Sequence, residues 1–360
     1  MNKKVKVTLK CLAALVFTLI IIVAGYVSYV FISYSRIDDM QALEVRNKGL
    51  SEEIRTGEKY TAFINNIGFG AYTQDFTFFM DGGTSSRAES AESVQRCIAL
   101  AGDKAEEFSP DFIMLQEVDF DSTRSFHIDQ QKILEDRFSE YSSVFAVNYD
   151  SAYLMYPFNS PHGASKAGIL TLSKTDISSA VRRSLPISES VTKLLDLDRC
   201  YSKARVSVEN GKELVLYNVH LSAYGGSDEI RAAQMNMLFS DIKDEYDKGN
   251  YCVTGGDFNH DFTGDSTQKL NGGMSVDFGW AQPFPVDMLP DCIVRADDYS
   301  HEEAIPTCRN CDVPYEKGNF TIIVDGFLVT KNVNIVSVSN ISTDFVYSDH
   351  NPVVLEFELI

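Results

Sequence analysis

The feature that most constrains this chain is an uncharged apolar segment near its start. Cys11–Ile32, CLAALVFTLIIIVAGYVSYVFI, contains no Asp, Glu, Lys or Arg over 22 residues. As an α-helix it is long enough to cross a bilayer with a hydrocarbon core about 30 Å thick. A cleaved signal peptide has a shorter apolar region and a small-residue cleavage site, for which Ser33-Tyr34-Ser35 is a poor match. The pattern favours an uncleaved transmembrane helix over 11–33, and the basic terminus beside it argues against a buried core helix.

The flanking charges predict the orientation of this helix. Four lysines lie within residues 1–10, whereas Arg36 follows the segment beside Asp38 and Asp39. Positive charge collects on the cytoplasmic side of single membrane spans. We therefore expect residues 1–10 to form a cytoplasmic tail, and the remainder of the chain to lie outside the cell membrane.

The body of the chain is predicted as one folded domain, residues 59–360, joined to the membrane by a polar linker, 34–58. Outside residues 1–34 the chain holds 28 Lys and Arg against 51 Asp and Glu, a formal charge of −23. Nucleic acids are bound largely through basic patches, so this acidic body makes long nucleic acid a less favoured partner. Nothing in the pattern implies an obligate protein partner.

Strand and helix patterns alternate from Tyr60 onward. Helical spacing of apolar residues predicts helices over 87–108, 130–138 and 228–246. Short apolar runs between them predict strands, and Asn210-Gly211 predicts a hairpin between two of these strands. This alternation is typical of sheets with helices packed outside them. The Gly-, Pro- and Asp-rich region 263–319 is expected to form loops around a site.

The cysteines suggest a disulfide and no zinc site. Cys308 and Cys311 form a single C-x-x-C with Cys292 upstream, whereas a structural zinc site normally needs four ligands. In an extracellular domain we expect a disulfide within this trio, although its pairing stays open. Three other cysteines lie in apolar settings and are predicted to be buried thiols: Cys97, Cys200 and Cys252.

Polar side chains stand at the ends of six apolar runs. Burying a lone carboxylate costs several kcal/mol, on the order of 3–5, unless it is paired or bound to a metal. Six separate exceptions are hard to explain, whereas convergence of the strand ends on one site explains them all. The residues are Asn65 and Asn66, Glu117, Asn218 and His220, Asp257 and Asn259, Asp325, and Asp349 and His350.

These residue types indicate phosphoester chemistry. Carboxylate and amide oxygens suit Mg²⁺ or Mn²⁺ better than a metal that prefers thiolates. Histidines backed by carboxylates can hold or protonate phosphate oxygens, and an aspartate can orient or deprotonate a water molecule. Together they fit metal-assisted attack of water on a phosphoester.

The order NIGFG, LQEVD, NVHLS, GGDFN, DGFLVT and SDHNPV resembles the endonuclease/exonuclease/phosphatase (DNase I-like) superfamily. This group includes DNase I-like nucleases, abasic-site endonucleases, inositol polyphosphate 5-phosphatases and neutral sphingomyelinases. The resemblance runs from about Tyr60 to the C-terminus. It implies a four-layered α/β sandwich, in which two packed sheets carry helices on both outer faces.

The resemblance also implies a metal site that takes Mg²⁺, with Mn²⁺ as an alternative. Glu117 would bind the catalytic ion, and Asn66 would lie close to both the metal and the phosphate. Asp349 would be a second ligand on the metal side or a support for His350. Two departures blur the subfamily: Asn65 stands where many members have an aromatic residue, and Gly326 where a His or Tyr is common.

The remaining roles implied by the resemblance concern the water and the phosphate. Asp257 would position or activate the attacking water, and Asn259 would steady the phosphate and that aspartate. His220 would contact the phosphate. His350 would bind the scissile phosphate, oriented by a carboxylate, for which Asp325 is the candidate.

Five further residues are weaker candidates. Lys166 and Arg205 could bring positive charge to a phosphate or serve as surface or strand-pairing residues. His260 could line the site or cap a turn, and His162 and His301 are expected in loops.

The sequence therefore predicts a membrane-anchored, metal-dependent phosphoesterase. Its phosphodiester or phosphomonoester substrate would be a lipid head group or a small phosphorylated molecule, because the anchor places the site near a bilayer. An extracellular Mg²⁺-dependent nuclease is the alternative, and an inactive binding module is a third reading. The apolar segment 149–158 could touch lipid, although ordinary packing is the simpler interpretation.

Overall fold

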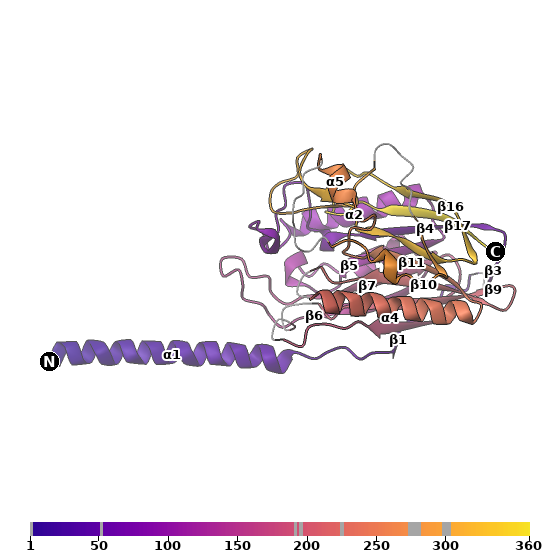
Figure 1. The fold of residues 1–360 in the computed structure, drawn as a ribbon. Coiled ribbons are helices and arrows are strands. Elements are labelled where there is room, and N and C mark those ends of the chain that lie inside the picture. Colours follow the sequence, from indigo (N-terminus) through magenta and orange to yellow (C-terminus); the bar gives the residue numbers. More distant parts are fainter. Residues whose placement is uncertain are drawn as a thin grey trace.

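The structure is a computed structural model that describes residues 3–50, 53–190, 193, 197–223, 227–272, 282–296 and 304–360. Helix α1 (Lys3–Ser33) projects from a domain built of two sheets (Figure 1). Its apolar side chains are exposed along almost the whole helix, and Val30 near its C-terminal end is buried. By length and composition α1 can cross a membrane, as the sequence predicted, although the helix begins earlier, at Lys3.

The first sheet has seven strands. Its neighbours are antiparallel except for β4 and β5, which are parallel and are joined through helix α2 (Ala91–Glu107). In sheet order the strands are β16 (Val333–Asn340), β17 (Val353–Leu359), β4 (Lys59–Asn66), β5 (Phe112–Asp119), β7 (Lys166–Ser173), β6 (Ser142–Asp150) and β2 (Val45–Arg46).

The second sheet has eight strands. β10 and β11 are parallel and are joined through helix α4 (Asp228–Asp247), and β9 and β10 form the antiparallel hairpin predicted from Asn210-Gly211. In sheet order the strands are β1 (Gln41–Ala42), β8 (Ser179–Ser184), β9 (Cys200–Val208), β10 (Glu213–His220), β11 (Tyr251–Asp257), β15 (Asp325–Thr330) and β12 (Ile293–Ala296), with β3 (Glu53–Ile54) beside β9.

The shorter elements lie in the connections. They are α3 (Gln130–Arg137), α5 (Ser266–Leu270), the 3-10 helices η1 (Gly68–Gly70), η2 (Phe79–Asp81), η3 (Thr123–Ser125) and η5 (Val286–Met288), and the two-stranded pair β13 (Cys308–Arg309) and β14 (Thr321–Ile322).

The two sheets pack face to face around the main core. Side chains such as Ile64 and Met114 from the first sheet pack with Leu216 and Phe327 from the second, and all four are fully buried. Each such side chain contributes about 1.5–3 kcal/mol of transfer free energy. Helices α2 and α3 cover the outer face of the first sheet, and α4 covers that of the second. This arrangement is the predicted four-layered α/β sandwich.

The segment predicted as a linker, 34–58, differs from that prediction. It contributes β1 and β3 to the second sheet and β2 to the first. Before β1, the Arg36 guanidinium donates to Leu185 O at 2.5 Å and pairs with Asp198 at 3.4 Å, while Ile37 N donates to the same carboxylate at 2.5 Å. These contacts join polar and charged groups, and the three strands are only two residues long, so the segment shows no apolar periodicity in the sequence.

The predicted disulfide is also absent. All seven cysteines lie in the described ranges and carry free thiols. Cys292 packs with α4 on the outer face of the second sheet, whereas Cys308 and Cys311 belong to two other hydrophobic clusters. Burial raises the pKa of Cys308 to about 12. The three predicted buried thiols, Cys97, Cys200 and Cys252, are buried.

Candidate active site

The two parallel strand pairs explain why the polar strand ends meet. The carboxyl ends of parallel neighbours lie at the same edge of a sheet. In the second sheet His220 on β10 is opposite Asp257 on β11, which is in turn opposite Asp325 on β15. In the first sheet Asn66 on β4 is opposite Gln116, the residue before Glu117 on β5.

The Asp257 carboxylate lies at the centre of the site. Its Oδ2 accepts from Asn66 Nδ2 at 3.1 Å and lies 3.5 Å from His220 Nε2 and 3.8 Å from His350 Nε2. Its Oδ1 accepts from the backbone N–H of Asn259 at 2.9 Å. Burial raises the pKa of Asp257 to about 6 against the opposing charge of His350. This carboxyl group therefore changes protonation close to neutral pH.

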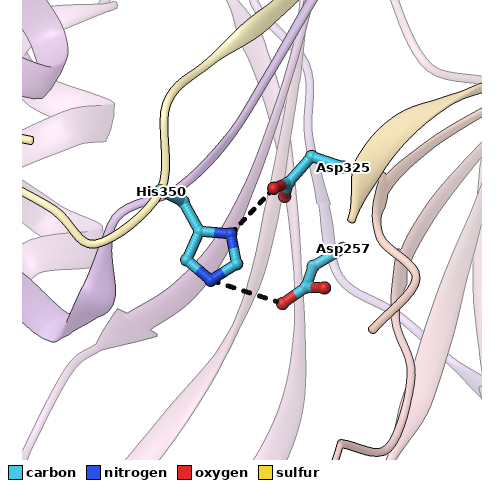
Figure 2. A group of neighbouring side chains, drawn as sticks. All are labelled: Asp257, Asp325 and His350. Carbon is cyan, nitrogen blue, oxygen red and sulfur yellow. Dashed lines mark hydrogen bonds and ion pairs between the residues drawn. The ribbon is translucent and has the colours of Figure 1, made fainter. Parts of the chain in front are cut away.

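His350 lies between two aspartates (Figure 2). Its Nδ1 is 2.8 Å from Asp325 Oδ2, while its Nε2 faces Asp257. Burial alone would lower the pKa of His350, but the Asp325 carboxylate and then Cys308 and Asp257 outweigh it and raise this pKa well above the usual value. The imidazole is therefore held as a cation at neutral pH, with one N–H directed into the site.

Glu117 reaches the site through an irregularity in β5. The pairing of β5 with β7 shifts between Leu115 and Val118, and Glu117 has a positive φ of 54°. Such a bulge re-aims a side chain. Glu117 Oε1 accepts from Asn66 Nδ2 at 3.2 Å, so the amide nitrogen of Asn66 joins Glu117 to Asp257.

Asp349 supplies a second acid close to Glu117. Its side chain is half-buried, and desolvation together with the nearby Glu117 raises the pKa of Asp349 to about 7, against the opposing charge of His350. Ser348 is positioned beside it: Ser348 Oγ donates to Asn66 O at 2.7 Å and accepts from the backbone N–H of His350 at 3.1 Å. The site therefore gathers more acid than its cations neutralise.

His220 differs electrically from His350. Burial, followed by the charges of Arg199 and His350, lowers the pKa of His220 well below its usual value. Its Nδ1 is buried without a hydrogen-bond partner, and its Nε2 lies 3.9 Å from Glu117 Oε1. The two histidines of the site therefore have opposite protonation states at neutral pH.

These residues line a pocket of about 330 Å³. It brings together Glu117, His220, Asp257, Asn259, Asp349 and His350, whereas Asn66 and Asp325 support it from beneath. Asn259 adopts a φ of 51° and donates through Nδ2 to Leu221 O at 2.8 Å.

Sequence reasoning missed the walls of this pocket. They include an aromatic side made by Phe69, Tyr72, Phe78 and Tyr149, and three arginines, Arg124, Arg199 and Arg309. These side chains come from connections between elements and from strand positions without a strand-end motif. Three of them lay inside segments noted for other reasons: Phe69 in NIGFG, Tyr149 in the apolar segment 149–158 and Arg309 in the C-x-x-C.

Arg124 shows how the cationic side is held. It forms two hydrogen bonds to the buried Asp119, of 2.8 and 3.1 Å, and its guanidinium lies 3.9 Å from the centroid of the Phe69 ring. A buried, paired arginine of this kind keeps its charge and its position. The pocket thus has an acidic floor and a basic, aromatic rim.

The weaker candidates lie in varied places. His162 lines the pocket, and burial lowers its pKa to about 3. Arg205 instead pairs with Glu245 on the outer face of the second sheet. Lys166 and His260 do not line the pocket, and His260 Nδ1 is 2.7 Å from Phe258 O. His301 lies outside the described residues.

The donor set fits a hard divalent cation. Ligand atoms of Asp257, Asp325 and His350 lie within 4.8 Å of one another, although the ring nitrogen nearest Asp325 already shares a hydrogen bond with it. Glu117 and Asp349 add two further carboxylates to the lining of the same pocket. Desolvation raises the pKa values of Asp257 and Asp349, and a divalent ion would favour their charged forms, whose oxygens are the ligands that Mg²⁺ prefers.

Comparison with known proteins agrees with this geometry. A model of the "Endonuclease/Exonuclease/phosphatase family" matches residues 66–350. No curated protein matches the chain.

Solved structures share the fold at low identity. An endonuclease/exonuclease/phosphatase from Beutenbergia cavernae is 18% identical with a TM-score of 0.54, covering 84% of this chain and 72% of its own. The human Nocturnin catalytic domain with bound sulfate anion is 15% identical with a TM-score of 0.52, covering 88% and 98%. ANGEL2, a 2',3'-cyclic phosphatase, is 13% identical with a TM-score of 0.53, covering 88% and 98%.

The family match covers most of the chain, so this protein belongs to the endonuclease/exonuclease/phosphatase family. That family is generally dependent on divalent metals and acts on phosphorylated substrates.

Proposed function

We propose that this member of the endonuclease/exonuclease/phosphatase family is a membrane-anchored phosphoesterase that hydrolyses a lipid head group or a small phosphorylated molecule. The observation that carries the proposal is the convergence of Asp257 and the Asp325–His350 pair in one pocket. Two proteins that share this fold, the Nocturnin catalytic domain with bound sulfate anion and the 2',3'-cyclic phosphatase ANGEL2, support a phosphorylated substrate.

Asp257 is the general base in this proposal. A carboxylate whose pKa is about 6 can accept a proton from water near neutral pH. Asn66 and Asn259 hold this carboxylate from two sides, so its position is fixed before substrate binds. The water oxygen then attacks phosphorus, and its proton passes to Asp257 as the ester oxygen leaves.

His350 binds a non-bridging phosphate oxygen through Nε2–H. Its raised pKa keeps the positive charge that a phosphate attracts, and Asp325 fixes the ring through Nδ1. The neutral His220 contributes a second ring nitrogen without added charge. Preorganised donors of this kind stabilise charge that develops in the transition state.

Glu117, Asn66 and Asp349 are the residues that would hold Mg²⁺, or Mn²⁺ in its place. A bound divalent ion would supply Lewis-acid stabilisation of charge on the phosphoryl oxygens. Asp349 must lose a proton to act as a ligand, because its pKa is raised to about 7.

Membrane attachment favours a substrate at the bilayer surface. We assign residues 1–10 to the cytoplasm and the catalytic domain to the outside of the cell, following the distribution of lysines around α1. The formal charge of −23 outside residues 1–34 disfavours long nucleic acid, which is a polyanion.

A panel of substrates tests the proposal. The full chain in detergent micelles with Mg²⁺ is incubated with glycerophospholipid, sphingomyelin, inositol phosphates and plasmid DNA. We expect hydrolysis of a lipid or small ester, and about 10³-fold slower turnover for Asp257→Asn. The exposed Asp136→Asn is the matched control and keeps full turnover.

Three outcomes would contradict the proposal. Cleavage of plasmid alone would identify a nuclease, and no hydrolysis with either Mg²⁺ or Mn²⁺ would favour a binding module. Full turnover by Asp257→Asn would remove Asp257 from the role of base.

A further inference from the structure

We propose that Tyr153–Phe158 and the C-terminal end of α1 form one surface that rests in the lipid bilayer and turns the pocket mouth toward phospholipid head groups. We call Tyr153–Phe158 the aromatic loop. This inference rests on the proposed function, because it names the substrate class that the same pocket meets.

The aromatic loop is attached directly to α1. Tyr26 Oη donates to Tyr153 O at 3.2 Å and accepts from Met155 N at 3.1 Å. Tyr29 Oη accepts from Tyr153 N at 3.1 Å. The loop that follows β6 projects from the domain on the same side as α1 (Figure 1). The helix and the loop are therefore held together by three hydrogen bonds.

The position of these tyrosines sets the depth of the aromatic loop. The uncharged segment of α1 ends at Ile32, and a helix rises about 1.5 Å per residue. Tyr26 and Tyr29 therefore lie about 9 and about 5 Å inside that end. Tyrosines at this depth mark the boundary between head groups and acyl chains. The loop backbone bonded to them lies at the same level.

The first half of the aromatic loop has its backbone N–H groups paired. Three consecutive N–H groups are hydrogen-bonded: those of Tyr153 and Met155 to the tyrosines of α1, and that of Leu154 to Gly163 O at 3.0 Å. Unpaired backbone groups cost several kcal/mol, on the order of 4, in lipid. In a loop surrounded by water, water molecules could accept from these N–H groups; here the acceptors of two of them are tyrosines of the apolar helix.

Three side chains of the aromatic loop are largely apolar and exposed, whereas Leu154 is buried. The exposed fractions are 83% for Phe158, 64% for Tyr156 and 46% for Met155. Aromatic side chains that lie together on a surface in this way insert about 5–10 Å into the interface of a bilayer. Since the loop is already fixed to a membrane helix, the bilayer is the occupant that this surface meets first.

The exposed surface continues into the mouth of the pocket. The Tyr156 ring is 5.8 Å from that of Phe79, centroid to centroid, and the neighbours of Phe79, Phe78 and Met80, line the pocket. His162, which follows the aromatic loop, lines the pocket as well. A head group could therefore pass from the bilayer surface to the catalytic residues along one apolar border.

Fluorescence in proteoliposomes tests the surface without requiring activity. The single tryptophan, Trp280, is replaced by Phe, and a new one is introduced by Phe158→Trp in the full chain. The control is Ile360→Trp, since the C-terminus lies on the side of the domain away from α1 (Figure 1). Vesicles of phosphatidylcholine with brominated acyl chains serve as the quencher.

We expect a blue-shifted emission and at least about threefold stronger quenching at position 158 than at position 360. Equal, weak quenching at both positions would overturn the proposal. A blue shift at 158 without quenching by bromine would also overturn it, because protein rather than lipid would then cover the loop.

A kinetic comparison separates this proposal from the proposed function. Phe158→Ser should slow hydrolysis of a phospholipid in phosphatidylcholine vesicles by about tenfold, while leaving that of a water-soluble nitrophenyl phosphoester unchanged. If Phe158→Ser changed the hydrolysis rates of both esters by the same factor, the membrane-facing mouth would be refuted. The phosphoesterase assignment would stand. Absence of hydrolysis of either ester by the unmodified chain would refute that assignment, and fluorescence would still decide the surface.

Discussion

Replacing Asp325 with asparagine tests the charge arrangement on which the proposed chemistry depends. The Asp325 carboxylate is buried and lies 2.8 Å from His350 Nδ1. A hydrogen bond to a charged group contributes about 1.5–3 kcal/mol, and a neutral amide in its place keeps about 1 kcal/mol. We therefore expect Asp325→Asn to lower the free energy of unfolding by about 1–2 kcal/mol.

The pH dependence of this loss follows from the raised pKa of His350. A group whose pKa is higher in the folded state than in the unfolded state stabilises the fold fully below the unfolded value, about 6.5 for histidine. That stabilisation disappears as pH rises through the raised pKa of His350. The difference between the unmodified protein and Asp325→Asn should therefore be largest near about pH 5.5 and shrink at alkaline pH.

Urea unfolding at several pH values measures the loss of stability and its pH dependence. Turnover measures the effect of Asp325→Asn on catalysis. Loss of the cation that binds phosphate should slow turnover by about 10²-fold at neutral pH. Asp136→Asn, an exposed carboxylate on α3, is the control for a change of charge alone. An Asp325→Asn protein with unchanged turnover, or with a stability loss that grows toward alkaline pH, would refute the reasoning.

Three other predictions concern the metal, the backbone and the topology. Because the pKa of Asp349 is raised to about 7, Mg²⁺ added in weak buffer near about pH 6 should release protons. Glu117→Gln should raise the Mg²⁺ concentration needed for half-maximal turnover by about tenfold or more. No proton release together with an unchanged Mg²⁺ requirement would contradict the metal site. A Cβ at Gly256, where φ is 142°, would lie 2.2 Å from Val219 O, so Gly256→Ala should lower the free energy of unfolding by about 3 kcal/mol. A Cβ at Gly211 meets no atom within 4 Å, so Gly211→Ala should lower it by about 1 kcal/mol. Equal losses of stability in chemical denaturation would argue against the steric explanation. Protease added to intact cells should remove the catalytic domain, and its protection would place that domain in the cytoplasm.

The sequence predicted those parts of the fold that repeat a simple pattern. The helices over 87–108, 130–138 and 228–246 correspond to α2, α3 and α4, because each has an apolar face that packs against a sheet. The strand ends that carry the polar residues could be found because an apolar run stops at a carboxylate, amide or imidazole. Their meeting in one pocket follows from the parallel pairing of β4 with β5 and of β10 with β11.

Other parts left no periodic signal. Strands β1, β2 and β3 are two residues long and are held by backbone bonds, so the segment that contains them looked like a linker. Arg124 and Tyr149 reach the pocket only because the chain folds back upon itself, and a single arginine or tyrosine has no distinguishing spacing. The predicted disulfide failed because C-x-x-C spacing does not by itself reveal that both sulfurs are buried as thiols.

The segment that joins α1 to the domain is fixed to the domain surface. Arg36 and Ile37 bind Asp198, and three short strands follow, so little of this segment is free to move. With α1 as the anchor, the catalytic centre would be held at a fixed height above the bilayer and at a fixed tilt relative to it. Such an enzyme would sample the surrounding leaflet by lateral diffusion of the whole protein, not by motion of the domain on a flexible linker. Its encounter rate would then depend on the surface density of substrate, and a flexible spacer inserted after Ser35 would remove the fixed height and tilt.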